Sequence, residues 1–119
     1  MTISSKRKPL RYIVNGDVTT LLLERKNGEV FECLIDTDDL PEVLRIKYAI
    51  CVTSKKGELT KYAHVTERVG VGKRRTVHLQ VILMKPEPGM MVDHINHNGL
   101  DNRRANLRVV TRSVNGLNR

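Results

Sequence analysis

The sequence predicts a small α+β protein in which an antiparallel β region precedes a C-terminal strand–loop–strand–helix unit. Three observations support this prediction. Short apolar segments with β-branched residues are separated by Asn-Gly turns within residues 12–36. Apolar residues recur at helical spacing just after residue 40. The stretch 90–119 then places two brief apolar segments on either side of a long polar loop that is rich in asparagine.

Length and charge limit the possible functions. With 119 residues the chain forms one domain, or one small domain with an appended unit. Its 21 Lys and Arg residues outnumber 13 Asp and Glu residues, which gives a net charge of +8. This balance favours a polyanionic partner, usually nucleic acid, with a merely basic protein as the alternative. Since only 3% of residues are aromatic, stacking on single strands is disfavoured, and double-stranded DNA is the expected partner.

Other classes of protein are disfavoured by what the sequence lacks. Its apolar runs stay far short of the roughly 20 residues of a membrane span, and the basic N-terminus is not followed by an apolar stretch. We therefore expect no membrane association and a cytoplasmic location. Cys33 and Cys51 do not form a Cys-x-x-Cys pair, so no structural zinc is expected. Each lies in an apolar run and is interpreted as a reduced, buried thiol.

The N-terminal part of the chain divides into an arm and a β-rich region. Residues 1–11 are expected to form a basic arm, and residues 12–88 a β-rich region with one short helix. Asn-Gly pairs at residues 15–16 and 27–28 mark turns, and the second pair is a strong hairpin signal between two apolar segments.

The short helix is expected to follow "DTDD". Asp38 or Asp39 can cap its first turn, and Pro41 suits the position just inside the start. Its apolar face would consist of Val43, Leu44 and Ile46.

A second hairpin and a further strand complete the β-rich region. The hairpin is expected around Lys56-Gly57. "RRTVHLQVILM", residues 74–84, is enriched in β-branched residues and predicts a strand that "KPEPG" stops. "GVGKRR", residues 70–75, lacks the Gly-Lys-Ser/Thr ending of a phosphate-binding loop. It is interpreted as a basic hairpin loop whose cations contact the DNA backbone: Lys73, Arg74 and Arg75.

The C-terminal unit is expected to span residues 89–119. "MMVDHI" predicts a short strand, residues 96–106 a turn-rich polar loop, and "LRVVT" a second short strand. A helix is expected to begin after Thr111 or Ser113, either of which can cap it.

Four polar side chains of this unit form a candidate catalytic group. Asp93 and His94 lie where the first strand ends, Asn106 lies where the loop returns, and Asn115 falls on the expected helix. Oxygens of Asp93 and Asn115 suit Mg²⁺, which needs few protein ligands. His94 can accept a proton from water near neutral pH, and the Asn106 carbonyl can hold the other ring N–H. Together these groups suit metal-assisted phosphodiester hydrolysis.

The stretch "VDHINHNGLDNRRANLRVVTRSVN" resembles the HNH endonucleases, especially the homing-type enzymes common in phages. The resemblance covers about 25 residues without a gap. It implies a ββα-metal (His-Me finger) fold and a DNA endonuclease that uses one divalent ion, Mg²⁺ or Mn²⁺. It also implies that His94 is the general base, that Asp93 and Asn115 bind the metal, and that Asn106 orients His94. The sequence departs from the family pattern at His97, where glycine is usual.

Alternatives remain for several of these residues. His94 could make only a structural hydrogen bond, Asp93 could cap a turn, and Asn106 could close the loop through an Asx turn. His97 could be a bystander or a contact for phosphate or metal. A group of arginines is expected to contact phosphate, with a solvated face as the alternative: Arg103, Arg104, Arg108 and Arg112.

The predicted function is a metal-dependent DNA endonuclease, either a nicking or a homing-type phage enzyme. One site per monomer implies nicking, unless a homodimer or sequential events cut both strands. Many relatives continue into a DNA-recognition module. Here we expect either that the N-terminal region supplies specificity or that such a module has been lost or cut away. Two alternatives are a catalytically degraded DNA-binding protein and an accessory nuclease within a packaging or repair complex, acting with a phage protein partner in the host cytoplasm.

Overall fold

The structure, a computed structural model, describes residues 9–53 and 60–111. Most of the expected basic arm, the turn at residues 56–57 and the predicted C-terminal helix with Arg112 and Asn115 lie outside these ranges. The strands are β1 (Arg11–Asn15), β2 (Val18–Glu24), β3 (Val30–Asp36), β4 (Cys51–Thr53), β5 (Tyr62–Gly70), β6 (Lys73–His78), β7 (Met91–His94), β8 (Asp101–Asn102) and β9 (Leu107–Val110). The helices are η1 (Thr37–Asp39), α1 (Leu40–Leu44), α2 (Leu79–Met84) and η2 (Arg104–Asn106).

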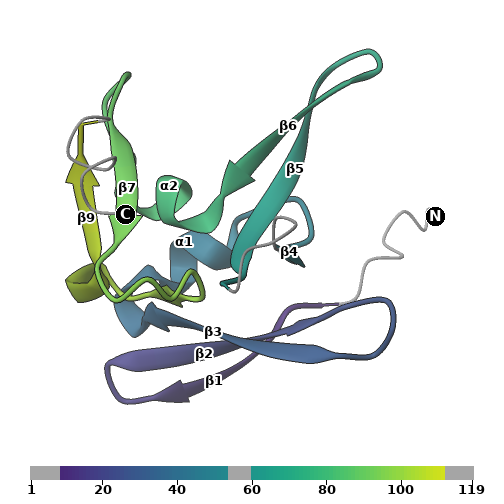
Figure 1. The fold of residues 1–119 in the computed structure, drawn as a ribbon. Helices are drawn as coiled ribbons and strands as arrows, with labels where there is room; N and C mark the ends of the chain where they lie inside the picture. Colours follow the sequence, from purple (N-terminus) through teal and green to yellow (C-terminus); the bar gives the residue numbers. More distant parts are fainter. Residues whose placement is uncertain (1–8, 54–59, 112–119) are drawn as a thin grey trace.

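Three sheets build this mixed α+β fold, and strands dominate it (Figure 1). The first has the order β1-β2-β3-β8, the second β4-β5-β6, and the third consists of β7 and β9. The β1–β2 and β2–β3 pairs are antiparallel and turn at the two Asn-Gly sites, so the predicted hairpins are confirmed. The antiparallel pairing of β4 with β5 agrees with the second predicted hairpin.

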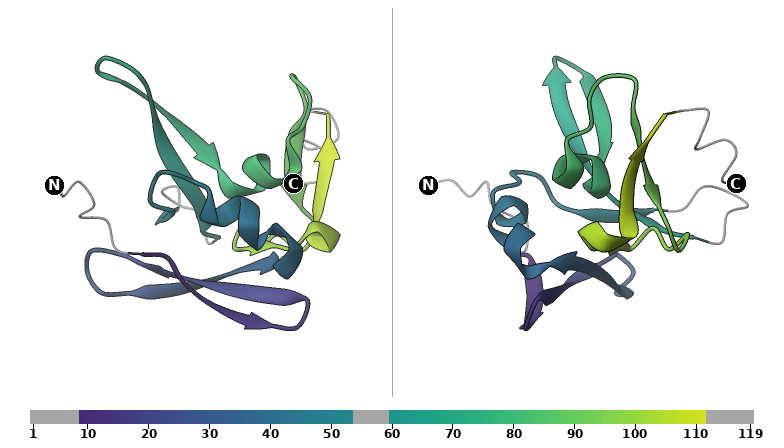
Figure 2. Two further views of the ribbon diagram at one scale, coloured as in Figure 1. Left: turned by 180° about the vertical axis from the view of Figure 1, so that it is seen from behind. Right: turned by 90° about the vertical axis from the view of Figure 1, so that its left-hand side faces the viewer.

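The hydrophobic core lies between the first sheet and the elements that cover it (Figures 1 and 2). Alternate residues of β2 and β3 point inward, which is the period-two pattern of a half-buried sheet. The opposite side is contributed by α1, β4, β5 and α2. The buried apolar residues of this cluster are Leu21, Leu23, Cys33, Ile35, Val43, Val52, Ala63, Leu79 and Leu83. Aliphatic side chains thus build the core, as the shortage of aromatic residues requires.

The predicted strand at residues 74–84 is wrong in its second half. Strand β6 ends at His78, and residues 79–84 form helix α2. Leu79 and Leu83, four residues apart, are both buried in the core. Gln80 is buried as well, and residues i, i+1 and i+4 share one face of a helix, whereas adjacent residues of a strand point to opposite faces. Burial therefore overrides the preference of the β-branched residues between them. The region 12–88 therefore holds two α-helices rather than one.

The helix predicted near residue 40 is present but shorter than expected. A 3-10 turn at Thr37–Asp39 leads into α1, which ends at Leu44 and leaves Ile46 outside. Asp39 makes no side-chain capping bond. Its carboxylate instead accepts hydrogen bonds from the Arg104 guanidinium, with an Nη2–Oδ1 distance of 2.9 Å. Asp39 therefore fixes the C-terminal loop to the N-terminal region.

Contacts cross the predicted boundary between residues 88 and 89 at several points. Strand β8, from the polar loop, pairs parallel with β3, where Leu34 aligns with Asp101. The backbone N–H of Leu34 donates to the carbonyl of Leu100 at 2.8 Å. Arg104 also donates to the carbonyl of Leu83 at the end of α2. The polar loop thus packs as part of the first sheet. Among the described residues, none of the helices is long and apolar enough to span a membrane.

Candidate active site

His94 is the last residue of β7 and lies directly opposite Leu107 of β9. The predicted short strands at residues 90–95 and 107–111 are therefore confirmed, and they pair antiparallel. The His94 side chain is directed inward, so that the residue is only 5% exposed. Burial lowers the pKa of His94 below its usual 6.5, against the opposing effects of the hydrogen bond that the ring makes to the Asn102 oxygen and the charges of Asp93 and Asp101. The ring is therefore neutral at pH 7 and able to accept a proton.

Asn102 holds the imidazole ring of His94. Its side-chain oxygen lies 2.7 Å from Nε2 of His94, and its amide nitrogen lies 3.4 Å from Sγ of Cys33. Both Asn102 and Cys33 are fully buried, and burial raises the pKa of the Cys33 thiol to about 12. With the amide N–H group turned to the sulfur, the oxygen is the atom that faces Nε2. That oxygen can only accept, so Nε2 carries the proton and the lone pair of the neutral ring is on Nδ1.

Asn106 does not make the contact with His94 that the sequence predicted. Its oxygen accepts the backbone N–H of Asn96 at 3.0 Å, and its amide donates to the Asn96 side chain and to the carbonyl of Asp101, each at 2.9 Å. Asn106 thus joins the two ends of the loop. This is close to the alternative named above, in which Asn106 closes the loop through an Asx turn. Because the loop carries Asn102, Asn106 supports the His94 contact only indirectly.

Short-range hydrogen bonds from asparagine side chains fold the polar loop. Oxygens of Asn96 and Asn98 accept the N–H groups two residues ahead, at 2.9 and 3.0 Å. Asn96 also donates to the Asp101 carboxylate at 3.0 Å. Between them, His97 adopts a left-handed conformation with φ of 64°, which is uncommon for a residue other than glycine. The asparagine density of the sequence is thus explained mainly by loop structure.

Tyr62 of β5 packs against the other side of the site. Its ring centroid lies 5.8 Å from that of His94 and 5.7 Å from that of His78. The loop approaches Tyr62 closely through Gly99, whose N–H donates to Oγ1 of Thr60 at 3.0 Å. A β-carbon at residue 99 would clash with the carbonyl oxygen of Lys61 and would lie 2.5 Å from the Tyr62 ring. Only glycine allows this approach.

Replacing Gly99 with alanine is expected to destabilise the protein by about 1–3 kcal/mol, because backbone and ring must move to accommodate one methyl group. Urea unfolding would measure the loss. Gly70→Ala is the matched control, since its β-carbon would make only ordinary contacts at 3.8 Å. Equal stabilities of the two variants would contradict the close approach of the loop to β5.

Asp93, the candidate metal ligand, lies next to His94 and opposite Arg108 in the β7–β9 pair. Nη2 of Arg108 donates to Oδ2 of Asp93 at 2.8 Å. Nε of Arg108 is buried and has no hydrogen-bond partner among residues 9–53 and 60–111. Arg108 therefore neutralises the carboxylate, and its side chain, which is 39% exposed, still has a part that a phosphate can reach.

The donor chemistry at this position fits a divalent ion that keeps most of its water. A group of three or more metal-binding side chains is not found in the described part of the chain. Asp93 supplies a carboxylate at the position next to His94 in the chain, and Asn115, the second expected ligand, lies outside the described residues. One or two protein oxygens are enough for Mg²⁺ when water and substrate phosphate complete its coordination.

The arginines near the loop are engaged in ion pairs. Arg103 binds the Asp101 carboxylate through two nitrogens, at 2.8 and 2.7 Å, and this hydrogen bonding lowers the pKa of Asp101. Arg104 and Arg108 pair with Asp39 and Asp93, as described above. Each guanidinium remains roughly half exposed, so a structural role and a phosphate contact are compatible.

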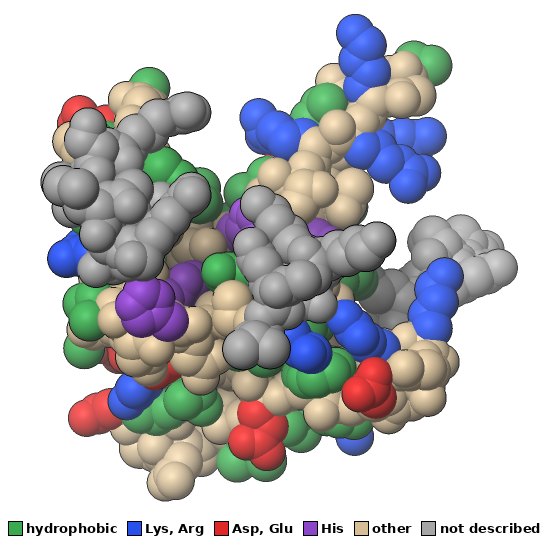
Figure 3. Space-filling view, in the orientation of Figure 1, with side chains coloured by type: hydrophobic (Ala, Val, Ile, Leu, Met, Phe, Trp, Pro, Cys, Tyr) green, Lys and Arg blue, Asp and Glu red, His purple; other side chains and the backbone are tan. Residues whose placement is uncertain are grey.

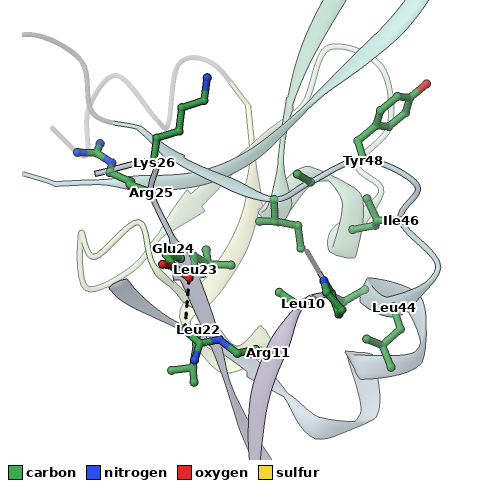
Figure 4. A pocket seen from close by; sticks show the side chains of 14 residues that line it. Leu10, Arg11, Leu22, Leu23, Glu24, Arg25, Lys26, Leu44, Ile46 and Tyr48 are labelled. Carbon is green, nitrogen blue, oxygen red and sulfur yellow. Dashed lines mark ion pairs between the residues drawn. The ribbon is translucent and has the colours of Figure 1, made fainter. Parts of the chain in front are cut away.

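A pocket of about 690 Å³ lies away from His94, between the first sheet and the segment that joins α1 to β4 (Figure 4). Apolar side chains such as Leu10, Leu22 and Ile46 line it. The Arg11–Glu24 ion pair, at 3.7 Å, lies at its side. None of the residues that contact His94 lines this pocket.

Comparison with known families agrees with this location of the site. Residues 75–117 match a family model described as HNH endonuclease, so an HNH endonuclease domain is present in this part of the chain. The resemblance found in the sequence is thereby confirmed. The family consists of nucleases that act on DNA, generally with a divalent metal ion. Neither the curated proteins nor the solved structures contain a match to the chain.

Sequence reasoning missed three residues of the site: Cys33, Tyr62 and Asn102. Asn102 lies within the stretch 96–106 that the sequence predicts to be a turn-rich polar loop, and the other two lie in strands with no local signal of function. The contact between the buried Asn102 amide and His94 becomes recognisable only when the pairing of β8 with β3 is known.

Proposed function

We propose that the protein is a metal-dependent DNA endonuclease that hydrolyses phosphodiester bonds in double-stranded DNA. The observation that supports this most strongly is His94. It is a buried, neutral histidine, held at Nε2 by Asn102 and adjacent in the chain to Asp93, within the segment that matches the HNH endonuclease family. A neutral imidazole with a fixed proton suits a general base.

In this proposal His94 removes a proton from water through Nδ1, while the Asn102 oxygen stabilises the imidazolium that forms by accepting the Nε2–H bond. Asp93, with Asn115, would hold the divalent ion. When bound, that ion would stabilise negative charge on the scissile phosphate and on the leaving oxygen. Arg108, which donates a hydrogen bond to Asp93, would contact the same phosphate. Mg²⁺ and Mn²⁺ both suit the oxygen donors of Asp93 and Asn115.

A single site per monomer favours nicking of one strand. We further propose that the protein is a homing-type phage enzyme, because residues 92–115 resemble that subgroup. The alternative with specific support is a DNA-binding protein without cleavage, because Arg108 occupies one oxygen of the carboxylate that a metal would need.

Removal of divalent metal is expected to abolish nicking. Supercoiled plasmid incubated with the protein should become open circular in the presence of Mg²⁺ or Mn²⁺, and EDTA should stop the conversion. Added metal in excess of EDTA should restore it. Binding of the duplex that persists in EDTA, together with no nicking under any metal condition, would favour the DNA-binding alternative.

A further inference from the structure

The β5–β6 hairpin projects from the body of the molecule (Figures 1 and 2). Its base is anchored, since Ala63 and Val65 are buried. Beyond Val65, residues 66–76 are exposed on both faces, apart from a half-buried Glu67. We call this segment the arm. An antiparallel ribbon whose side chains are exposed on both faces contributes little to the core, so its length requires another explanation.

Positive charge is concentrated on the arm. It carries four cations, Arg68, Lys73, Arg74 and Arg75, and one acidic residue, Glu67, which pairs with Arg75 at 2.6 Å. In the space-filling view, Lys and Arg side chains surround the projecting hairpin (Figure 3). Arg68 and Arg74 are direct cross-strand partners. Like charges at that position destabilise a ribbon, which indicates that a polyanion offsets their repulsion in the functional state.

The tip of the arm is apolar. Val71, in the turn, is fully exposed at 101%, and Val69 is 50% exposed where the register shifts between Arg68 and Gly70. A single exposed valine is ordinary on a protein surface. Val71 differs because it stands at the end of a projecting, cation-rich ribbon. Such a tip can enter between base pairs after the cations have bound the backbone.

We propose that the arm binds duplex DNA in the minor groove and that Val71 acts as an apolar wedge that bends the duplex. The choice of DNA as partner rests on the proposed function. The minor groove is favoured because its negative potential attracts arginine and because apolar wedges act there. The arm thereby supplies affinity and DNA deformation outside the catalytic segment.

The arm has a fixed position relative to His94, the candidate general base. His78, the last residue of β6, contacts Tyr62, and Tyr62 contacts His94. At a rise of about 3.3 Å per residue, Val71 lies roughly 23 Å along the ribbon from His64, the partner of His78. At about 3.4 Å per base pair, the ribbon from His64 to Val71 has the length of about seven base pairs, so the bend is expected away from the nick rather than at it.

The test uses the full chain and a duplex labelled at both ends, studied in EDTA so that no cleavage occurs. Energy transfer between the ends reports bending, and anisotropy reports binding. Val71→Ser should remove most of the bending and weaken binding by about 3- to 10-fold. Arg74→Thr should lower the slope of log affinity against log salt by about 1. It should also leave urea stability unchanged or higher, because a like-charge pair is removed. Val14→Ser, at an exposed strand position of similar kind, is the control.

Three results would each contradict the proposed role of the arm. Val71→Ser could bend DNA as much as wild type, Arg74→Thr could keep the wild-type salt slope, or the wild-type protein could leave the duplex straight. These outcomes are distinct from failure of the nuclease. If the protein binds and bends DNA through the arm but never nicks it, the proposed nuclease activity is wrong and the proposed role of the arm stands. A protein that nicks normally while both variants bind and bend like wild type would do the reverse.

Discussion

The variant His94→Ala is expected to nick supercoiled DNA about 10²- to 10⁴-fold more slowly than wild type, which is the usual contribution of a general base. The expectation follows from the buried, neutral ring whose Nε2 is occupied by Asn102. Binding to the same DNA in EDTA should change little, because an inward-facing neutral side chain contributes no charge to the surface. Initial rates of plasmid relaxation at saturating protein would give the ratio.

His97→Asn is the matched control for this experiment. His97 is exposed, three residues further along the same loop, and its positive φ is tolerated by asparagine. If both histidine variants lose activity to the same extent, the loop as a whole rather than the base is responsible. Full activity in His94→Ala would remove the proposed catalytic role.

Asn102→Leu is expected to slow nicking by about 10- to 100-fold while leaving a folded protein, a loss typical of groups that orient a catalytic side chain. Leucine has similar size but offers no acceptor, so the proton of the neutral His94 ring is no longer fixed on Nε2. The ¹⁵N shifts of the His94 ring should therefore move from the Nε2–H pattern toward a mixture of tautomers. A structural defect elsewhere would not produce that change.

Cys33→Ser provides the comparison for Asn102→Leu. The serine oxygen can still accept from the Asn102 amide, so the ring should keep its tautomer and the rate should stay within about threefold of wild type. Asn102→Leu with a wild-type ring spectrum and a wild-type rate would show that the 2.7 Å contact does not orient His94.

Short sequence patterns predicted the hairpins of the first sheet, because the conformation of a tight turn depends on the few residues within it. The Asn-Gly pairs at residues 15–16 and 27–28 fix their turns through backbone conformation alone, with Gly16 and Gly28 at positive φ. The stretch 79–84 was mistaken for a strand because its type depends on burial of Leu79 and Leu83 against distant strands. Local propensity carries no information about that burial.

The site was predictable in its residue types but not in its contacts. Asp93 and His94 are adjacent in the sequence, and their motif spacing is specific. The partner of the His94 ring was not foreseen, because Asn102 is oriented by Cys33, which lies 69 residues away in the chain. Neighbouring asparagines in the loop look alike in sequence, and only tertiary structure separates Asn102, which faces the core, from Asn106, which closes the loop.

The parallel pairing of β8 with β3 also has a consequence for how the molecule is made. Strand β3 leaves the ribosome well before residues 101–102, so its outer edge carries open backbone groups until the polar loop is synthesised. That loop pairs with the edge and also carries Asn102, which contacts His94, and Arg104, which contacts Asp39. Completion of the sheet and assembly of the candidate active site therefore depend on the same segment, and a nascent chain that lacks the loop has neither.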